Sequence, residues 1–406
     1  MTPTATERLN VAILVIGQTL FMVASITVMT LSGLVGHALG PDPGLATLPI
    51  AMMMLGTVVS TLPASLYMKR VGRRAGFITG AGIGGIGGGL LAFGAVALGS
   101  FWLFCLGNLL LGLYQGFAMY YRFAAADVAS PAFRPRAMSF VMAGGVVAAF
   151  AGPWNASAAS GWIAAAPSGG PYLMIALLAL ISIGLLTFLR VPPSSEPRVG
   201  DPQRAMTEIA RSRRFIVAAL AAASGYTIMI VVMTSTPLAM RSAGFELGDV
   251  AFIMQWHVLG MFAPSFFTGS LIARFGHTRL LLAGCALLGA SVLTAALGGT
   301  LVLFWIALVL LGIGWNFLFI GGSALLTTAH SEAERGKVQG INDLLIFSLV
   351  TLGALLAGKL LHLAGWATLN LAMLPLIILV AVAALWLGGP IAPRAARAAE
   401  AAGDTR

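Results

Sequence analysis

Long apolar stretches alternate with short polar turns along most of the chain. Most apolar stretches run for about 20 residues, the helical length that crosses a hydrocarbon core of roughly 30 Å. A backbone in lipid must satisfy its own hydrogen bonds, so we expect an all-α polytopic membrane protein. The pattern predicts twelve spans, near residues 10–36, 44–68, 75–98, 101–123, 137–158, 171–190, 215–240, 250–273, 280–298, 300–326, 338–360 and 366–388.

The composition agrees with this pattern. Charged residues make up 9% of the chain and apolar residues 59%, whereas soluble domains carry roughly 25% charged residues. The 50 glycines fit packed transmembrane helices, because small residues let helices approach closely. Cys105 and Cys285 fall inside spans and are expected to be buried thiols.

Two similar basic turns indicate a duplication. Residues 69–74 read KRVGRR and residues 273–279 read ARFGHTR, with their glycines 204 residues apart in a chain of 406. Leu111-Gly112 and Leu311-Gly312 repeat at a similar distance of 200 residues. The spacing predicts two pseudo-symmetric six-helix halves. We expect an N-terminal half at 1–190, a linker at 191–214, a C-terminal half at 215–389 and a mobile cytoplasmic tail at 390–406.

The linker is the longest internal polar segment. Asp201-Pro202 has the character of a helix start, and Ala205, Met206, Ile209 and Ala210 form an apolar stripe, which predicts a short surface helix. A linker without regular structure is the alternative.

The positive charge indicates orientation in a membrane. If the N-terminus is cytoplasmic, 20 of the 23 Lys and Arg residues fall on the cytoplasmic side, as the positive-inside rule requires. The net charge of +10 is then explained by topology, and nucleic acid is not an expected partner. We expect both termini to be cytoplasmic, in the inner membrane of a bacterial-type cell.

The twelve spans, the central linker and the basic turns resemble the major facilitator superfamily, whose signature loop reads approximately G-x-x-x-D-R-x-G-R-R. The resemblance implies a monomeric secondary transporter that moves a small organic solute by alternating access. Ser65, Lys69 and Ala273 stand where that loop has a Gly and its acids. The matching residues are Arg70, Gly72, Arg73 and Arg74 in the first turn and Gly269, Arg274 and Gly276 in the second.

Polar groups inside the spans are candidates for a central cavity, since a charge facing lipid costs roughly 2.5–3.5 kcal/mol. Asn108, Gln115 and Arg122 recur every seven residues and so share one helical face, which we expect to line the cavity. Near mid-depth, where transporters place their sites, Gln18, Tyr226 and Asn316 suit substrate contact. Interhelical packing is the alternative role for each.

The resemblance implies that spans 4 and 5 meet spans 10 and 11 at a cytoplasmic gate. We hypothesise that Arg122 pairs with Asp343 when the cavity faces outward. The alternatives are a local contact of Arg122 with Asp127 or snorkelling to the surface. Without the usual loop acids, the gate is expected to depend on Arg122, Asp127 and Asp343.

Coupling to protons is the default expectation, with sodium coupling or uniport as alternatives. His257 titrates near neutrality in its ordinary form, and Asp343 is the rival proton site. No GxxxxGK[ST], HExxH or paired CxxC motif occurs, so we expect no ATPase, metal site, cofactor or other enzyme activity.

The direction of transport is weakly marked. Gly144-Gly145 and Gly152-Pro153 partly resemble a run found in antiporters of the family and lean towards efflux, although Gly-Pro also kinks packed helices. Uptake of a neutral nutrient or vitamin, and a non-transporting membrane sensor on the same fold, are the alternatives.

Overall fold

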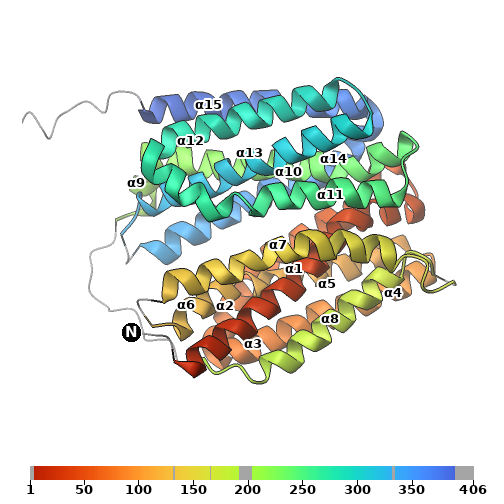
Figure 1. Ribbon diagram of the computed structural model, residues 1–406, viewed down its shortest axis with the longest axis horizontal. Coiled ribbons are helices and arrows are strands. Elements are labelled where there is room, and N and C mark those ends of the chain that lie inside the picture. Colours follow the sequence, from red (N-terminus) through yellow and green to blue (C-terminus); the bar gives the residue numbers. More distant parts are fainter. Residues whose placement is uncertain (1–3, 131–132, 165, 192–203, 332–333, 389–406) are drawn as a thin grey trace, which may run out of the picture.

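The computed structural model describes residues 4–130, 133–164, 166–191, 204–331 and 334–388, and the regular structure in these ranges is helical. The helices run side by side as two bundles (Figure 1). In chain order they are α1 (Ala5–Leu39), η1 (Pro43–Leu45), α2 (Leu48–Val71), α3 (Arg73–Thr79), the π-helical η2 (Gly80–Gly87), α4 (Gly88–Ala97), α5 (Phe101–Ala118), α6 (Tyr121–Val128), α7 (Arg134–Ala158), α8 (Gly170–Leu186), α9 (Met206–Ala210), α10 (Arg213–Ser242), α11 (Leu247–Phe262), α12 (Ser265–Ala296), α13 (Leu301–Thr327), α14 (Arg335–Leu371) and α15 (Leu374–Gly388).

Several predicted spans contain more than one of these helices. α3, η2 and α4 form one continuous segment, and so nearly do α5 and α6. α12 holds the end of one span and the whole of the next on either side of Gly276, and α14 turns in the same way at Gly365. Joined across these breaks, the described helices confirm the predicted all-α fold of twelve segments. By length and composition alone, eight described segments could cross a membrane.

The two basic turns have the same backbone. Gly72 ends α2 with φ 87°, and Gly276 has φ 80° between its two helical stretches. Residues with a Cβ rarely adopt this conformation, so each turn requires glycine. The duplication read from the two turns is therefore a duplication of backbone geometry.

A second pair of glycines sets the helix crossings inside each half. A Cβ added at Gly112 on α5 would lie 3.0 Å from the Gly56 Cα of α2, and it would overlap the Met53 carbonyl oxygen. A Cβ at Gly312 on α13 would lie 3.0 Å from the Gly260 carbonyl carbon of α11, and it would overlap the His257 carbonyl oxygen. The same backbone contact therefore holds equivalent helices together in both halves.

In the described part of the chain, hydrogen bonds join the two bundles at one end. We call the end that holds the Gly72 and Gly276 turns the basic end, and the opposite one the far end. At the far end, the Thr47 hydroxyl donates to the Ala354 carbonyl at 2.7 Å and accepts from the Gly358 N–H at 2.9 Å. Figure 1 shows the bundles converging away from the N-terminus.

The linker is fastened to the C-terminal bundle just before α9. The Arg204 guanidinium donates to both carboxylate oxygens of Glu334, at 2.9 and 2.7 Å, and to the Ala329 carbonyl. The backbone N–H groups of Arg204 and Ser331 also donate to that carboxylate. These contacts hold the pKa of Glu334 well below its usual range, the Arg204 side-chain hydrogen bonds being the largest cause. The predicted helix start at Asp201-Pro202 lies outside the described residues, as does the tail.

Candidate functional site: a cavity between the two bundles

A cavity of about 390 Å³ lies between the two bundles. Its lining reaches Met29, Met54 and Met233 towards the far end. Towards the basic end it reaches Thr327, the last residue of α13, and Gln339, in the second turn of α14. Since the far end is closed by the Thr47 hydrogen bonds, the structure represents a state whose cavity extends towards the basic end.

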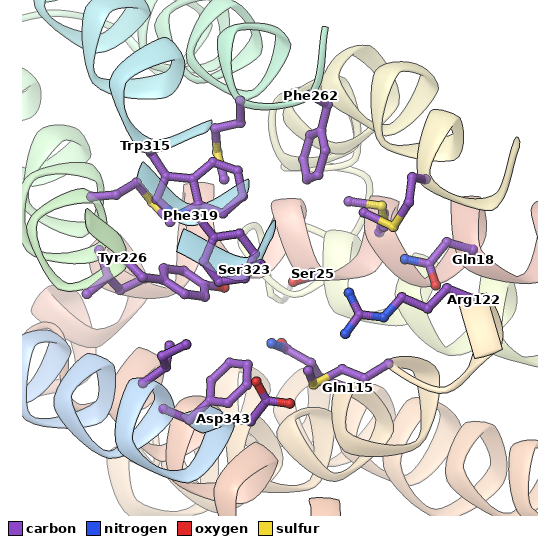
Figure 2. Close-up of a pocket in the computed structure, with 18 of the residues that line it drawn as sticks. Gln18, Ser25, Gln115, Arg122, Tyr226, Phe262, Trp315, Phe319, Ser323 and Asp343 are labelled. Carbon is purple, nitrogen blue, oxygen red and sulfur yellow. The ribbon is translucent and has the colours of Figure 1, made fainter. Parts of the chain in front are cut away.

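The N-terminal bundle forms a flexible wall rich in methionine. Nine of the 18 methionines of the chain line the cavity, and six of them belong to this wall. Thioether side chains are polarizable and adapt to the shape of a ligand. The hydrogen-bonding groups on this wall include Gln18, Ser25, Gln115 and Arg122 (Figure 2). The six methionines are Met22, Met29, Met54, Met119, Met138 and Met142.

The C-terminal bundle forms an aromatic wall. Trp315 and Phe319, one turn apart on α13, stack with their ring centroids 5.0 Å apart and an interplanar angle of 10°. Tyr226 of α10 meets both rings edge-on, at 5.6 and 5.4 Å. Phe347 of α14 packs against Tyr226 at 5.9 Å, and Phe262 of α11 against Trp315 at 6.2 Å. Such edge-to-face contacts hold the rings in fixed orientations.

Two buried carboxamides in the lining have unused acceptors. Gln115 of α5 is 8% exposed and Asn342 of α14 is 3% exposed. Among the described residues, neither the Gln115 Oε1 nor the Asn342 Oδ1 has a hydrogen-bond partner. A buried acceptor without a partner costs roughly 1–3 kcal/mol. Both oxygens are therefore suited to N–H or O–H donors on a bound solute.

Five of the residues singled out from the sequence lie on this cavity. Gln18 and Gln115 come from the methionine-rich wall, and Tyr226 belongs to the aromatic cluster. Arg122 and Asp343 face the cavity from opposite bundles (Figure 2). The structure thus brings together groups that lie up to 325 residues apart in the sequence.

Asn108 and Asn316 do not line the cavity, and their expected place on it is corrected. Asn108 is fully buried within the N-terminal bundle, where it accepts from the Ser32 hydroxyl at 3.1 Å. Asn316 donates to the Met261 carbonyl at 2.6 Å and accepts from the Thr268 hydroxyl at 2.7 Å. Both amides are used in joining helices, because at their positions a neighbouring helix meets the side chain instead of the cavity.

His257 is also buried away from the cavity. It is fully enclosed between α11 and α13, with its Nδ1 2.8 Å from the Leu308 carbonyl oxygen. The ring is not part of the cavity lining. A proton role for His257 would have to act without contact with a solute in the cavity.

The charges assigned to the gate are divided between two places. Asp127 forms an ion pair with Arg73 of the first basic turn, with Nε and Oδ2 2.6 Å apart. Arg122 lies over the Phe123 ring at 4.7 Å. Arg122 and Asp343 line the same cavity from opposite bundles. Their pairing in the opposite state stays a prediction.

The aromatic cluster was largely missed in the sequence. Of its members, only Tyr226 was predicted to contact substrate, although Trp315 and Phe319 stand four residues apart on a mid-depth stretch of span 10. That spacing places two rings on one helical face and could have indicated a stacking surface. Phe262 and Phe347 offered no such signal, because single phenylalanines recur throughout the spans.

Metal ligands do not gather in the described part of the chain. Within it, no group of three or more His, Cys, Asp or Glu side chains could hold a metal ion. Cys105 and Cys285 are buried free thiols.

Comparison with known proteins identifies the family. The sequence profile of the Major Facilitator Superfamily matches residues 14–263 and 231–405. This chain belongs to that superfamily of membrane transporters, and it is not an enzyme. The fold agrees: a crystal structure of the transporter FucP in its outward conformation superposes with a TM-score of 0.62. The similarity covers 94% of this chain and 99% of that one, at 19% sequence identity.

Two relatives place the chain more narrowly. The riboflavin transporter RfnT of Brucella anthropi is 43% identical over 384 residues, which cover 94% of this chain and 96% of the relative. The uncharacterized MFS-type transporter YdeG of Bacillus subtilis is 31% identical over 378 residues, covering 89% of this chain and 87% of that protein.

Proposed function

We propose that this protein carries riboflavin or a closely related flavin across the cytoplasmic membrane. The observation that carries the proposal is the aromatic wall, where Trp315 and Phe319 stack and Tyr226 and Phe347 fix their surroundings. A flat tricyclic ring system gains roughly 1–3 kcal/mol from each good aromatic stacking contact. The similarity to RfnT over nearly the full length of both chains supports the same solute.

The size and charge of the cavity support a neutral solute of this kind. Its volume of about 390 Å³ falls within the range of roughly 300–1,000 Å³ typical of small-molecule sites. The described lining contains one cation, Arg122, and one carboxylate, Asp343. A neutral ring system with hydrogen-bonding groups matches this balance better than a highly charged solute.

For the direction of transport, we propose uptake. The lean towards efflux rested on the glycines of span 5, and packing accounts for them. A Cβ at Gly145 would lie 2.8 Å from the Phe262 ring, and one at Gly152 would lie 2.7 Å from the Ile26 Cβ. These glycines let α7 approach α11 and α1 closely, so they carry no information on direction. With the basic end in the cytoplasm, the described state would release solute inwards.

For coupling, we propose a proton taken up by Asp343. This carboxyl faces the cavity, where solute and proton can influence each other directly, whereas His257 lies outside the lining. Arg122 on the opposite wall would stabilise the deprotonated carboxylate when the bundles close at the basic end. Sodium coupling remains the alternative that the experiment separates.

Flux measurements test the proposal. Purified protein in sealed proteoliposomes should accumulate radiolabelled riboflavin when the outside is acidic, and a protonophore should abolish the accumulation. An imposed sodium gradient without a pH gradient should have no effect. Binding of riboflavin without flux would identify a sensor, and absence of both would overturn the flavin assignment. Loading the vesicles with riboflavin and reversing the pH gradient tests efflux.

A further inference from the structure

The polarity of the cavity lining changes between the aromatic cluster and the basic end. On α13 the residues at successive turns of one face are Trp315, Phe319, Ser323 and Thr327, and all four line the cavity. At a rise of about 1.5 Å per residue, this face passes from two rings to two hydroxyls over roughly 18 Å. The hydroxyls lie on the side of the basic end.

α14 shows the same gradient, although it runs in the opposite direction. Phe347 is at the level of the aromatic cluster, where it contacts Tyr226. One turn nearer the basic end stand Asn342 and Asp343, followed by Gln339. α13 and α14 therefore both place aromatic rings at one depth of the cavity, which we call the aromatic level. Both place polar side chains nearer the basic end, at what we call the polar level.

The part of the cavity nearer the far end is apolar. Its polar groups are few, Ser25 being one, and its lining is dominated by methionines, among them Met29, Met54 and Met233. Hydroxyl groups of a solute placed there would lose their water and find few partners, at roughly 1–3 kcal/mol for each unsatisfied group. The polar level offers the buried Asn342 Oδ1, which has no partner among the described residues.

We infer that the solute binds with its ring system against the aromatic level and its polyhydroxylated chain towards the basic end. Asn342 Oδ1 accepts from a chain hydroxyl, and the Ser323 hydroxyl of α13, which lines the same cavity, is a second partner for the chain. This inference rests on the proposed flavin function and adds two subsites to it. It assigns Asn342 and Ser323 to the chain, and Trp315 and Phe319 to the ring.

A pair of flavins separates the two subsites. Riboflavin carries the ring and the ribityl chain, whereas lumiflavin carries the ring with a methyl group in place of the chain. Affinities are measured on the purified full-length protein by quenching of flavin fluorescence. We expect Asn342→Leu to weaken riboflavin about tenfold, the loss of one or two buried hydrogen bonds, and to change lumiflavin less than about twofold. Ser323→Ala should act in the same direction, about threefold.

Two controls make the result specific. Asn370→Leu removes another buried carboxamide of α14, one that lies outside the cavity and bonds the Trp366 carbonyl, and it should alter neither affinity. Phe319→Ala should weaken both flavins by the same factor. Equal loss of both flavins in Asn342→Leu and Ser323→Ala, or loss of neither, would overturn the orientation while riboflavin binding still supports the function. Failure of both flavins to bind the unmodified protein would overturn the function and the orientation together.

Discussion

The two bundles share a backbone plan but present different chemistry to the cavity. Gly72 and Gly276 make the same turn, and Gly112 and Gly312 make the same close crossing. Yet one wall is built of methionines with amides and a cation, and the other of interlocked aromatic rings. The difference shows that the duplicated positions are those that hold helices together. The cavity-facing positions have diverged, which allows one solute to meet an adaptable surface and a rigid one.

The opposed charges on the two walls should give the largest effect. Asp343→Arg or Arg122→Asp alone should reduce riboflavin flux in proteoliposomes about a hundredfold or more, because each places like charges across the closing gate. The double variant Arg122→Asp/Asp343→Arg should recover at least a tenth of the flux if the pair forms in the outward-facing state. A double variant as inactive as either single one would exclude the pairing.

The contrast between the walls predicts unequal losses of binding. Trp315→Ala should weaken riboflavin about tenfold to a hundredfold, since it removes a preorganised stacking surface worth roughly 1–3 kcal/mol. Met119→Ala on the opposite wall should weaken it less than about fivefold, because neighbouring thioethers can move into the space. Fluorescence titration of both purified variants measures the difference. Similar losses of affinity in the two variants would mean that both walls contribute equally to riboflavin binding.

The shared backbone predicts equal effects on stability. Gly112→Ala and Gly312→Ala each place a methyl group against a carbonyl of the neighbouring helix, an overpacking that costs roughly 1–3 kcal/mol. Thermal unfolding in detergent, followed by tryptophan fluorescence, should show both variants destabilised to a similar extent. Gly94→Ala is the matched control, since no heavy atom lies within 4 Å of the added Cβ. A large effect in one half alone would contradict the equivalence of the crossings.

The smallest effect concerns the contact between the linker and the C-terminal bundle. Glu334→Gln should lower the unfolding temperature by a few degrees at pH 7, whereas Glu208→Gln, on the exposed side of α9, should not. The folded pKa of Glu334 is depressed, so its contribution is fully present above the unfolded pKa of about 4.3 and declines progressively as the pH falls from there towards the folded pKa. Unfolding scans from pH 7 to pH 3.5 should therefore show the variant approaching the unmodified protein. A pH-independent difference would point to lost packing instead.

Much of the architecture could be predicted from the sequence. Apolar length sets the spans, because a helix that crosses lipid needs about 20 apolar residues wherever it stands in the bundle. The turn at Gly72 and its copy at Gly276 indicate the duplication, because the positive φ of such a turn favours glycine at the same place in each half. The small residues of span 5 were harder to interpret. Gly145 and Gly152 fit both an antiporter pattern and close packing, and only their contacts with Phe262 and Ile26 distinguish the two.

The candidate site could be predicted only in part. Gln115 and Arg122 lie on the cavity as their shared helical face suggested, but Asn108 on the same face turns into the bundle and bonds Ser32. A helical wheel gives the angle between side chains, not the neighbour that each one meets. The register between helices decides whether an amide faces a solute or another helix, and it depends on contacts between residues far apart in the chain.

The sequence by itself determined the membrane location, the twelve helices, the duplication and the family, because each follows from local length, local charge or a local turn. Only the tertiary structure decided which bundle supplies the rings, that Asp127 is held by Arg73, and that Asn342 belongs to the cavity lining with a buried oxygen that has no partner among the described residues. These features depend on how helices distant in the sequence pack together. A bilayer selects helices by their hydrophobicity, but their order and rotation around a cavity are selected by close packing and by the pairing of buried polar groups.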